Sequence, residues 1–176
     1  MGETACCFTG HRILPLNILE SVITRLNSEI DKLISQGVTV FYSGGALGFD
    51  QIAASAIICK KEEGKNIKLI FALPCKNQDK LWTMEQRVLY QNLLNEADEV
   101  IYVCEEYNED CMKKRNYYMV DHSDFGIFAS QKQCWTVRRN FCFAKTVLDC
   151  AVEPSAQSKT HHPRSSGSLL NHPHTS

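Results

Sequence analysis

Two short stretches, CFTGHR at residues 7–12 and YSGGALGFD at residues 42–50, decide the fold of this chain. Each lies where an apolar run gives way to a helical pattern, which is typical of a strand-to-helix turn at the edge of a parallel sheet. Glycines at such turns let the backbone approach a ligand closely, and the free N–H groups of the following helix favour an anion. The sequence therefore predicts a binding site for a phosphate-bearing small molecule.

Strand and helix patterns alternate on both sides of these turns. We expect strands at 4–9, 38–42, 67–73, 99–104 and 125–128. Between them, apolar residues at three- and four-residue spacing predict the first helix, with Leu16, Leu19, Ile23, Leu26, Ile30 and Leu33. The apolar residues Leu81, Met84, Val88 and Leu93 predict the third helix. Ile52, Ala53, Ala56 and Ile57 mark the second helix, and the segment 112–120 the fourth.

This alternation, in units of ~30 residues, indicates right-handed crossovers and a mostly parallel sheet covered on both faces. The predicted fold class is α/β with three layers. Ligands bind such sheets outside the carboxyl ends of the strands. Depending on the strand order, both glycine turns, the Pro74 loop and the Asp121–Asp124 turn face that edge.

The length of 176 residues favours one domain followed by a tail. Residues 130–176 carry six Lys/Arg and two Asp/Glu, so the body has thirteen basic and eighteen acidic residues. A mildly acidic body argues against nucleic-acid binding through phosphate contacts. We expect a domain over residues 3–129 and a disordered tail over 130–176, where the segment 131–145 has no clear period and 155–176 is rich in Ser, His and Pro.

The nine cysteines form no CxxC pair, and no secretory signal precedes them. We interpret Cys6, Cys7, Cys59 and Cys104 as small core residues in a reducing cytosol. No apolar stretch approaches the ~20 residues that span a bilayer. We expect a soluble, cytoplasmic protein with no membrane partner, no metal and no cofactor; the sequence leaves a homo-oligomer open.

The ordered set FTGHR (8–12), SGGALGFD (43–50), Pro74, Trp82, Arg115-Asn116 and Met119-Val120-Asp121 closely resembles the YpsA-like branch of the SLOG superfamily. That resemblance covers roughly residues 4–128. It implies a Rossmann-like fold and the binding of a nucleotide or nucleotide-derived ligand in a sensing or regulatory role. The superfamily also includes the DNA-processing protein DprA and the LOG phosphoribohydrolases.

The resemblance implies a ligand site built mainly on the two glycine turns. Gly10, Gly44, Gly45 and Gly48 would line the phosphate side, Asp50 would take the acidic position after the turn, and Arg12 could pair with a phosphate. Arg115 and Asn116 would reach the pocket from the other side. The full set of predicted ligand-binding residues is Thr9, Gly10, His11, Arg12, Ser43, Gly44, Gly45, Gly48, Asp50, Arg115 and Asn116.

Three other interpretations remain open. The glycines could serve only tight turns and close packing. A LOG-type enzyme would cleave an N-glycosidic bond, but Ser43 replaces the proline of the LOG pattern, and Ala54 lies where a later acid would be sought. A DprA-like DNA module would need a basic groove. We therefore predict no catalytic residue.

The resemblance stops near residue 128, before the Gly-Gly-Thr turn, helix and strand with which family members usually continue. The segment 133–141, read one nucleotide later, can be encoded to give Asn-Ala-Gly-Arg-Ser-Gly-Gly-Thr. One hypothesis is a frameshift near residues 128–133, and the alternative is a divergent C-terminus.

Overall fold

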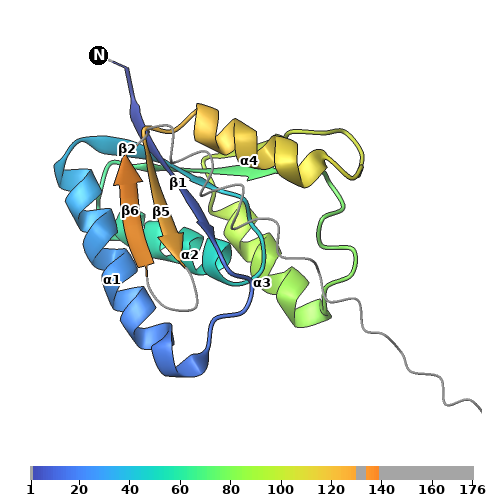
Figure 1. The fold of residues 1–176 in the computed structure, drawn as a ribbon, viewed down its shortest axis with the longest axis horizontal. Helices are drawn as coiled ribbons and strands as arrows, with labels where there is room; N and C mark the ends of the chain where they lie inside the picture. The colour runs from blue at the N-terminus through green and yellow to red at the C-terminus, as the bar shows by residue number, and fades with distance from the viewer. Residues whose placement is uncertain (1, 130–133, 139–176) are drawn as a thin grey trace, which may run out of the picture.

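The computed structural model describes residues 2–129 and 134–138, which form a sheet flanked by helices (Figure 1). Its strands are β1 (Thr4–Gly10), β2 (Val38–Ser43), β3 (Lys68–Leu73), β4 (Glu99–Tyr102), β5 (Phe125–Ala129) and β6 (Cys134–Arg138). Its helices are α1 (Leu16–Ser35), α2 (Phe49–Glu62), α3 (Met84–Asn95) and α4 (Cys111–Asp121). The predicted order of strands and helices is confirmed as far as β5, with element ends displaced by a few residues.

Within the described residues the sheet has the strand order β4-β3-β2-β1-β5-β6. β1 pairs in parallel with both β2 and β5, and β3 pairs in parallel with β2 and β4. β6 is antiparallel to β5, with Phe125 opposite Arg138. The sheet is therefore mostly parallel, as the sequence predicts, and the chain reverses direction across it between β4 and β5.

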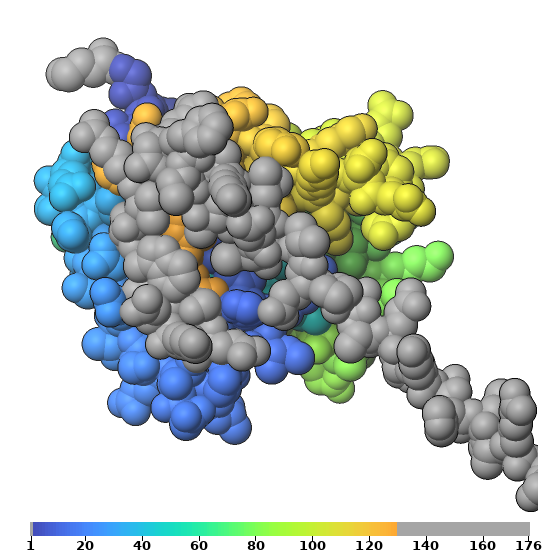
Figure 2. All heavy atoms as spheres, in the orientation of Figure 1, coloured from blue at the N-terminus to red at the C-terminus, as the bar shows by residue number. Residues whose placement is uncertain are grey.

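The helices cover the sheet in three layers. Side chains of α1, α2 and α3 pack with one face of the strands. Met119 and Val120 of α4 pack with Val40, Tyr42 and other residues of the opposite face. Because the chain crosses back over the sheet after β4, a right-handed crossover places α4 on the face opposite to the other helices. In Figure 2, α1 (blue) and α4 (yellow) lie at opposite sides of the molecule.

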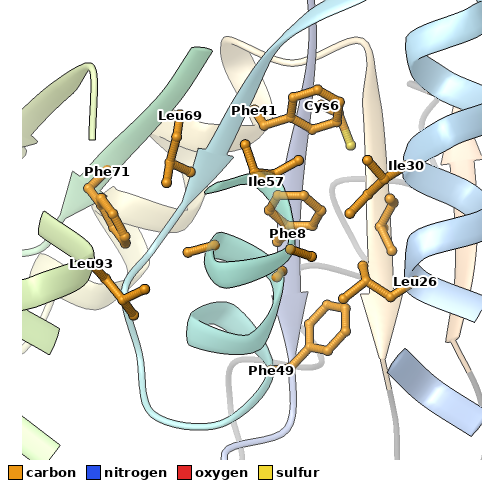
Figure 3. Packing of buried hydrophobic residues seen from close by; sticks show 14 of the residues in the cluster. Cys6, Phe8, Leu26, Ile30, Phe41, Phe49, Ile57, Leu69, Phe71 and Leu93 are labelled. Carbon is orange, nitrogen blue, oxygen red and sulfur yellow. The ribbon is translucent and has the colours of Figure 1, made fainter. Parts of the chain in front are cut away.

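The larger core lies between the sheet and the first three helices (Figure 3). Val22, Leu26, Ile30 and Leu33 form the buried stripe of α1. Their spacing of three or four residues places them on one side of the helix. Beneath them the rings of Phe8 and Phe41 stack with centroids 5.9 Å apart, and Figure 3 shows Phe49 close to Phe8 and Leu26.

Two packing predictions are wrong. In α3 Leu93 is buried, but Met84 and Val88 are 74% and 52% exposed; Leu81 lies before the helix begins and is 94% exposed. The buried side of α3 consists of Tyr90 and Leu93, so the apolar pattern identified the helix but not the face that packs. Cys59, on the outer side of α2, is exposed and Cys104 is only half-buried, whereas Cys6 and Cys7 are buried as expected.

Both glycine turns follow the carboxyl ends of their strands, as predicted. The Asp121–Asp124 turn does not share that edge, because it connects the end of α4 to the start of β5. There the Asp124 carboxylate accepts a hydrogen bond from the N–H of Ala5 (3.1 Å), and the Asp124 N–H donates to the Ala5 carbonyl (2.8 Å). This turn therefore fastens the amino end of β5 to β1.

The sequence did not predict β6, which falls in a segment without a clear strand period. Apart from residues 134–138, the tail predicted to be disordered lies outside the described residues. Within the described part of the chain, no helix has the length and apolar content needed to cross a bilayer.

Candidate functional site at the glycine turns

The second glycine turn is a tight backbone loop between Ser43, the last residue of β2, and Phe49, the first of α2. Gly45 and Gly48 have φ values of 64° and 86°, in the left-handed region that side chains other than glycine rarely adopt. The Ser43 hydroxyl accepts a hydrogen bond from the Gly45 N–H (3.2 Å) and donates one to the Asp50 carbonyl (3.0 Å). These bonds fix the entry of the chain into α2.

The two glycine turns lie against each other. The N–H of Phe49 donates to the carbonyl of His11 at 3.2 Å. A Cβ added to Gly48 would collide with the Arg12 carbonyl, so only glycine permits this approach. The loop after β1 and the N-terminus of α2 therefore form one continuous edge, as the sequence predicts, and Arg12 lies exposed on it.

A buried ion pair lies beneath the glycine turn. Nη1 of Arg115, on α4, is 3.6 Å from Oδ2 of Asp50, in the first turn of α2. Asp50 and Arg115 are only 4% and 6% exposed. The guanidinium occupies the space that a side chain at Gly44 would fill. Gly44 therefore allows Arg115 to reach across the carboxyl edge of the sheet from the α4 layer.

This ion pair leaves hydrogen-bonding capacity unused. Among the described residues, Nε and Nη1 of Arg115 are buried and have no hydrogen-bond partner. A buried donor without an acceptor costs roughly 1–3 kcal/mol, and more when it is charged. Arg115 is thus held in place by charge and packing, with two donors available for an acceptor.

Burial dominates the electrostatics of the pair. It raises the pKa of Asp50 from 3.8 to about 6, against the opposing effects of Arg115, the backbone of Ala46, Arg12 and the backbone of Gly44. Burial also lowers the pKa of Arg115, and the Asp50 carboxylate opposes this change. The site therefore contains a carboxyl group that titrates close to neutral pH beside two guanidinium groups.

A side chain from the loop after β3 holds the glycine turn from the other side. Nε2 of Gln78 lies 3.5 Å from the Gly44 carbonyl and 3.4 Å from the Gly45 carbonyl, and it donates to the hydroxyl of Tyr90 at 2.8 Å. Nε2 of Gln51 approaches the Gly45 carbonyl at 3.4 Å. The turn is consequently anchored to α2 and α3 through its carbonyl groups.

The remaining predicted site residues occupy different positions around this edge. Gly10 is close-packed, because a Cβ there would meet the Phe49 side chain and the Ala129 carbonyl at 2.7–2.8 Å. Thr9 is buried at the end of β1, and Asn116 is buried beside Arg115 on α4. The structure thus brings Arg12, Ser43, the glycines, Asp50 and Arg115 together. It also gives each of the four turn glycines a packing reason.

Sequence reasoning missed Gln78 and Gln51 entirely. Neither belongs to a glycine motif, and nothing in the local pattern distinguishes Gln78 from other polar loop residues. Tyr90, on α3, is a packing residue: it is 5% exposed and meets Trp82 edge to face at a centroid distance of 5.1 Å.

No group of three or more His, Cys, Asp or Glu side chains suited to a metal occurs within residues 2–129 and 134–138. An open hollow of about 310 Å³ lies at the amino edge of the sheet, lined by Glu3, Thr39, Asn66, Lys68 and neighbours. It is remote from the glycine turns, and the Glu3–Lys68 ion pair (2.7 Å) belongs to its lining. The buried Arg115 guanidinium and the glycine turns lie at the opposite, carboxyl edge of the sheet.

The protein is similar to several bacterial chains. It is 37% identical over 121 residues to the uncharacterized SPbeta prophage-derived protein YoqJ of Bacillus subtilis, with 62% of this chain and 65% of YoqJ aligned. It is 23% identical over 128 residues to a UPF0398 protein of Staphylococcus epidermidis, with 68% of each chain aligned. The chain thus spans less than two thirds of the length of YoqJ.

Two solved structures give partial matches. DNA processing protein A from Helicobacter pylori, described for its single-stranded DNA binding mode, matches with 20% identity and a TM-score of 0.48 over 72% of this chain and 54% of that one. The structural genomics target TM1055 matches with 12% identity and a TM-score of 0.43 over 72% and 59%.

A family model named YpsA, described as the YspA SLOG family, matches residues 6–139. This range begins within β1 and runs past the end of β6. It includes both glycine turns and the α4 segment that carries Arg115. The match confirms the resemblance found in the sequence motifs, but it continues to residue 139, so the expectation that the resemblance stops near residue 128 is wrong. The chain belongs to the YpsA family of SLOG proteins.

Proposed function

We propose that this protein binds a small nucleotide-derived anion at the two glycine turns and acts as a ligand sensor or regulatory module. The observation that carries the proposal is the buried Arg115 guanidinium, whose Nε and Nη1 donors lack acceptors beside the glycine turn. An anion that accepts from these donors would recover the free energy that their burial costs. The N-terminus of α2, a helix of 14 residues, adds a favourable potential at the same place.

The family of this chain indicates which class of ligand the site would bind. SLOG resemblance implies nucleotides and their derivatives, and the glycine turns lie at the carboxyl edge where such ligands bind in open α/β sheets. We propose Arg12 as the accessible contact for the phosphate, because it is exposed and its charge reaches Asp50 and Arg115. The other residues of the predicted set would shape or line the site.

A substitution of Arg12 tests this proposal most directly. Arg12→Ala removes an exposed charge, so we expect normal folding and at least tenfold weaker binding of the nucleotide that binds the wild type best. Arg25→Ala, which removes an exposed arginine from α1, is the matched control and should leave binding unchanged. The assay is calorimetric titration with adenosine 5′-monophosphate (AMP), ADP, ADP-ribose and cyclic AMP. Equal affinities in both variants, or no binding of any of these compounds by the wild type, would contradict the proposal.

One observation favours a second candidate, cleavage of an N-glycosidic bond in a nucleotide. Asp50 has a pKa of about 6, which suits a general acid or base near neutral pH. However, its carboxyl group is buried and paired with Arg115, so the binding role has the better support. Release of free adenine from AMP, lost in Asp50→Asn, would establish the enzyme instead.

A further inference from the structure

The charges beneath the glycine turn do not balance. Arg12 and Arg115 both act on one carboxylate, that of Asp50. The thiol of Cys7 on β1 also faces the pair, and burial raises its pKa to about 12, so it adds no negative charge at neutral pH. Burial likewise raises the pKa of Tyr90, which faces Arg115 from α3.

Among the described residues, Cys111, one turn before Arg115 on α4, also faces the guanidinium. With Asp50 ionised, the site has two cations and one anion. With Asp50 protonated, it has two cations and no anion. The protonation state of a single buried carboxyl group therefore decides whether the site accommodates one or two negative charges.

The position of the unused donors forces a ligand close to that carboxyl group. Nη1 of Arg115 has no hydrogen-bond partner, and the same atom is 3.6 Å from Oδ2 of Asp50. An oxygen atom that accepts from Nη1 must lie beside the Asp50 carboxylate. Two negative groups that share one site strongly favour protonation of one of them.

We infer that the site binds a dianionic phosphate monoester together with one proton, which Asp50 takes from solvent as the phosphate settles against Arg115. The inference rests on the proposed ligand site at the glycine turns. No covalent bond of the ligand changes, and the proton ends on a carboxylate oxygen of Asp50. The protonated site then offers two positive charges to the two negative charges of a terminal phosphate. A phosphodiester carries only one negative charge. The site with ionised Asp50 has a net charge of one positive unit and balances that charge without taking up a proton.

The pH dependence of ligand binding tests the inference on the wild-type chain. Above about pH 7 a phosphate monoester is already dianionic, since its second pKa is about 6. Uptake of one proton by the protein then raises the Kd of AMP about tenfold for each pH unit between pH 7 and pH 8.5. Titrations at pH 7.5 in two buffers with different ionisation enthalpies should give close to one proton per AMP. Ribose 5-phosphate should show the same proton count, and cyclic AMP should bind more weakly with no pH dependence.

A variant assigns the proton to Asp50. Asp50→Asn keeps the shape of the side chain but cannot titrate, so the Kd of AMP should become independent of pH and lower than that of the wild type at pH 8.5. Asp31→Asn, which removes an exposed carboxylate from α1, is the control and should keep the tenfold dependence. The calorimetric proton count needs no variant, so absence of proton uptake by the wild type overturns the inference even if Asp50→Asn does not fold.

The binding results distinguish failure of the proton-uptake inference from failure of the proposed function. AMP that binds with a constant Kd and no proton uptake overturns the inference and leaves the proposed function intact. Cyclic AMP that binds as tightly as AMP overturns the choice of a dianion. If none of the nucleotides binds at any pH, the proposed function fails together with the inference.

Discussion

The contact between the two glycine turns predicts an unusually costly glycine substitution at Gly48. Gly48→Ala would place a methyl group against the backbone carbonyl of Arg12, at a residue with φ 86° and ψ −124°. Backbone strain of this kind costs roughly 1–3 kcal/mol, and overpacking adds typically 1–3 kcal/mol. We expect a loss of about 3–5 kcal/mol in the free energy of unfolding, measured by urea denaturation followed by circular dichroism.

Gly64 provides the control. It has the same φ of 86°, but an added Cβ there would meet no atom within 4 Å, so Gly64→Ala carries only the backbone strain, about 1–2 kcal/mol. The excess for Gly48→Ala, about 2 kcal/mol, should appear as a melting temperature lower by about 4–8 °C than that of Gly64→Ala. Equal losses in the two variants would refute the packing of the second turn against the first.

Four further predictions concern charge, capping, partners and the coding sequence. Burial raises the pKa of Asp50 from 3.8 to about 6, so the protonated carboxyl group stabilises the fold fully below about pH 4, and about 3 kcal/mol of the free energy of unfolding is lost as the pH rises through 6. Asp50→Asn should lack this pH dependence when urea unfolding is measured at several pH values. Identical pH dependence in the wild type and the variant would contradict the prediction. Thr83→Ala removes the capping box that Thr83 forms with Gln86 at the start of α3, which should cost about 1 kcal/mol in the same assay, whereas an unchanged midpoint would argue against the cap. The acidic body predicts no salt-sensitive binding of single-stranded DNA at low micromolar protein, and a salt-dependent rise in fluorescence anisotropy would overturn that expectation. The frameshift hypothesis predicts that the coding DNA across residues 125–145, read in the +1 frame, encodes Ser-Gly-Gly-Thr followed by an amphipathic helix and a strand; early closure of that frame would support a divergent C-terminus.

The order of strands and helices was predictable because it depends on local periodicity. The stripe Leu26, Ile30 and Leu33 repeats at helical spacing, and each strand is a short apolar run. The face of a helix that packs is harder to predict when apolar residues lie on both sides. Met84 and Val88 of α3 lie four residues apart, as core residues of a helix often do, yet both are exposed.

The candidate site was predictable in its backbone and less so in its side chains. Gly45 and Gly48 have backbone angles that favour glycine, so the motif itself indicates the turn. The reason for Gly44 is different, because its neighbour is Arg115, which lies 71 positions away in the sequence and on the opposite face of the sheet. Only the crossover after β4 brings these residues together, and no local pattern encodes that contact. The same holds for Gln78, which reaches the turn from the loop after β3.

The hydrogen bonds from Gln78 to the glycine turn bear on how a ligand would be received. Glycine-rich loops have many accessible conformations, and ordering them on binding normally opposes association through lost entropy. Here the Gly44 and Gly45 carbonyls are already held by Gln78, and Gln78 is held by Tyr90. The turn is therefore in place before a ligand arrives. The entropy of association should then be less unfavourable than that of a free glycine loop.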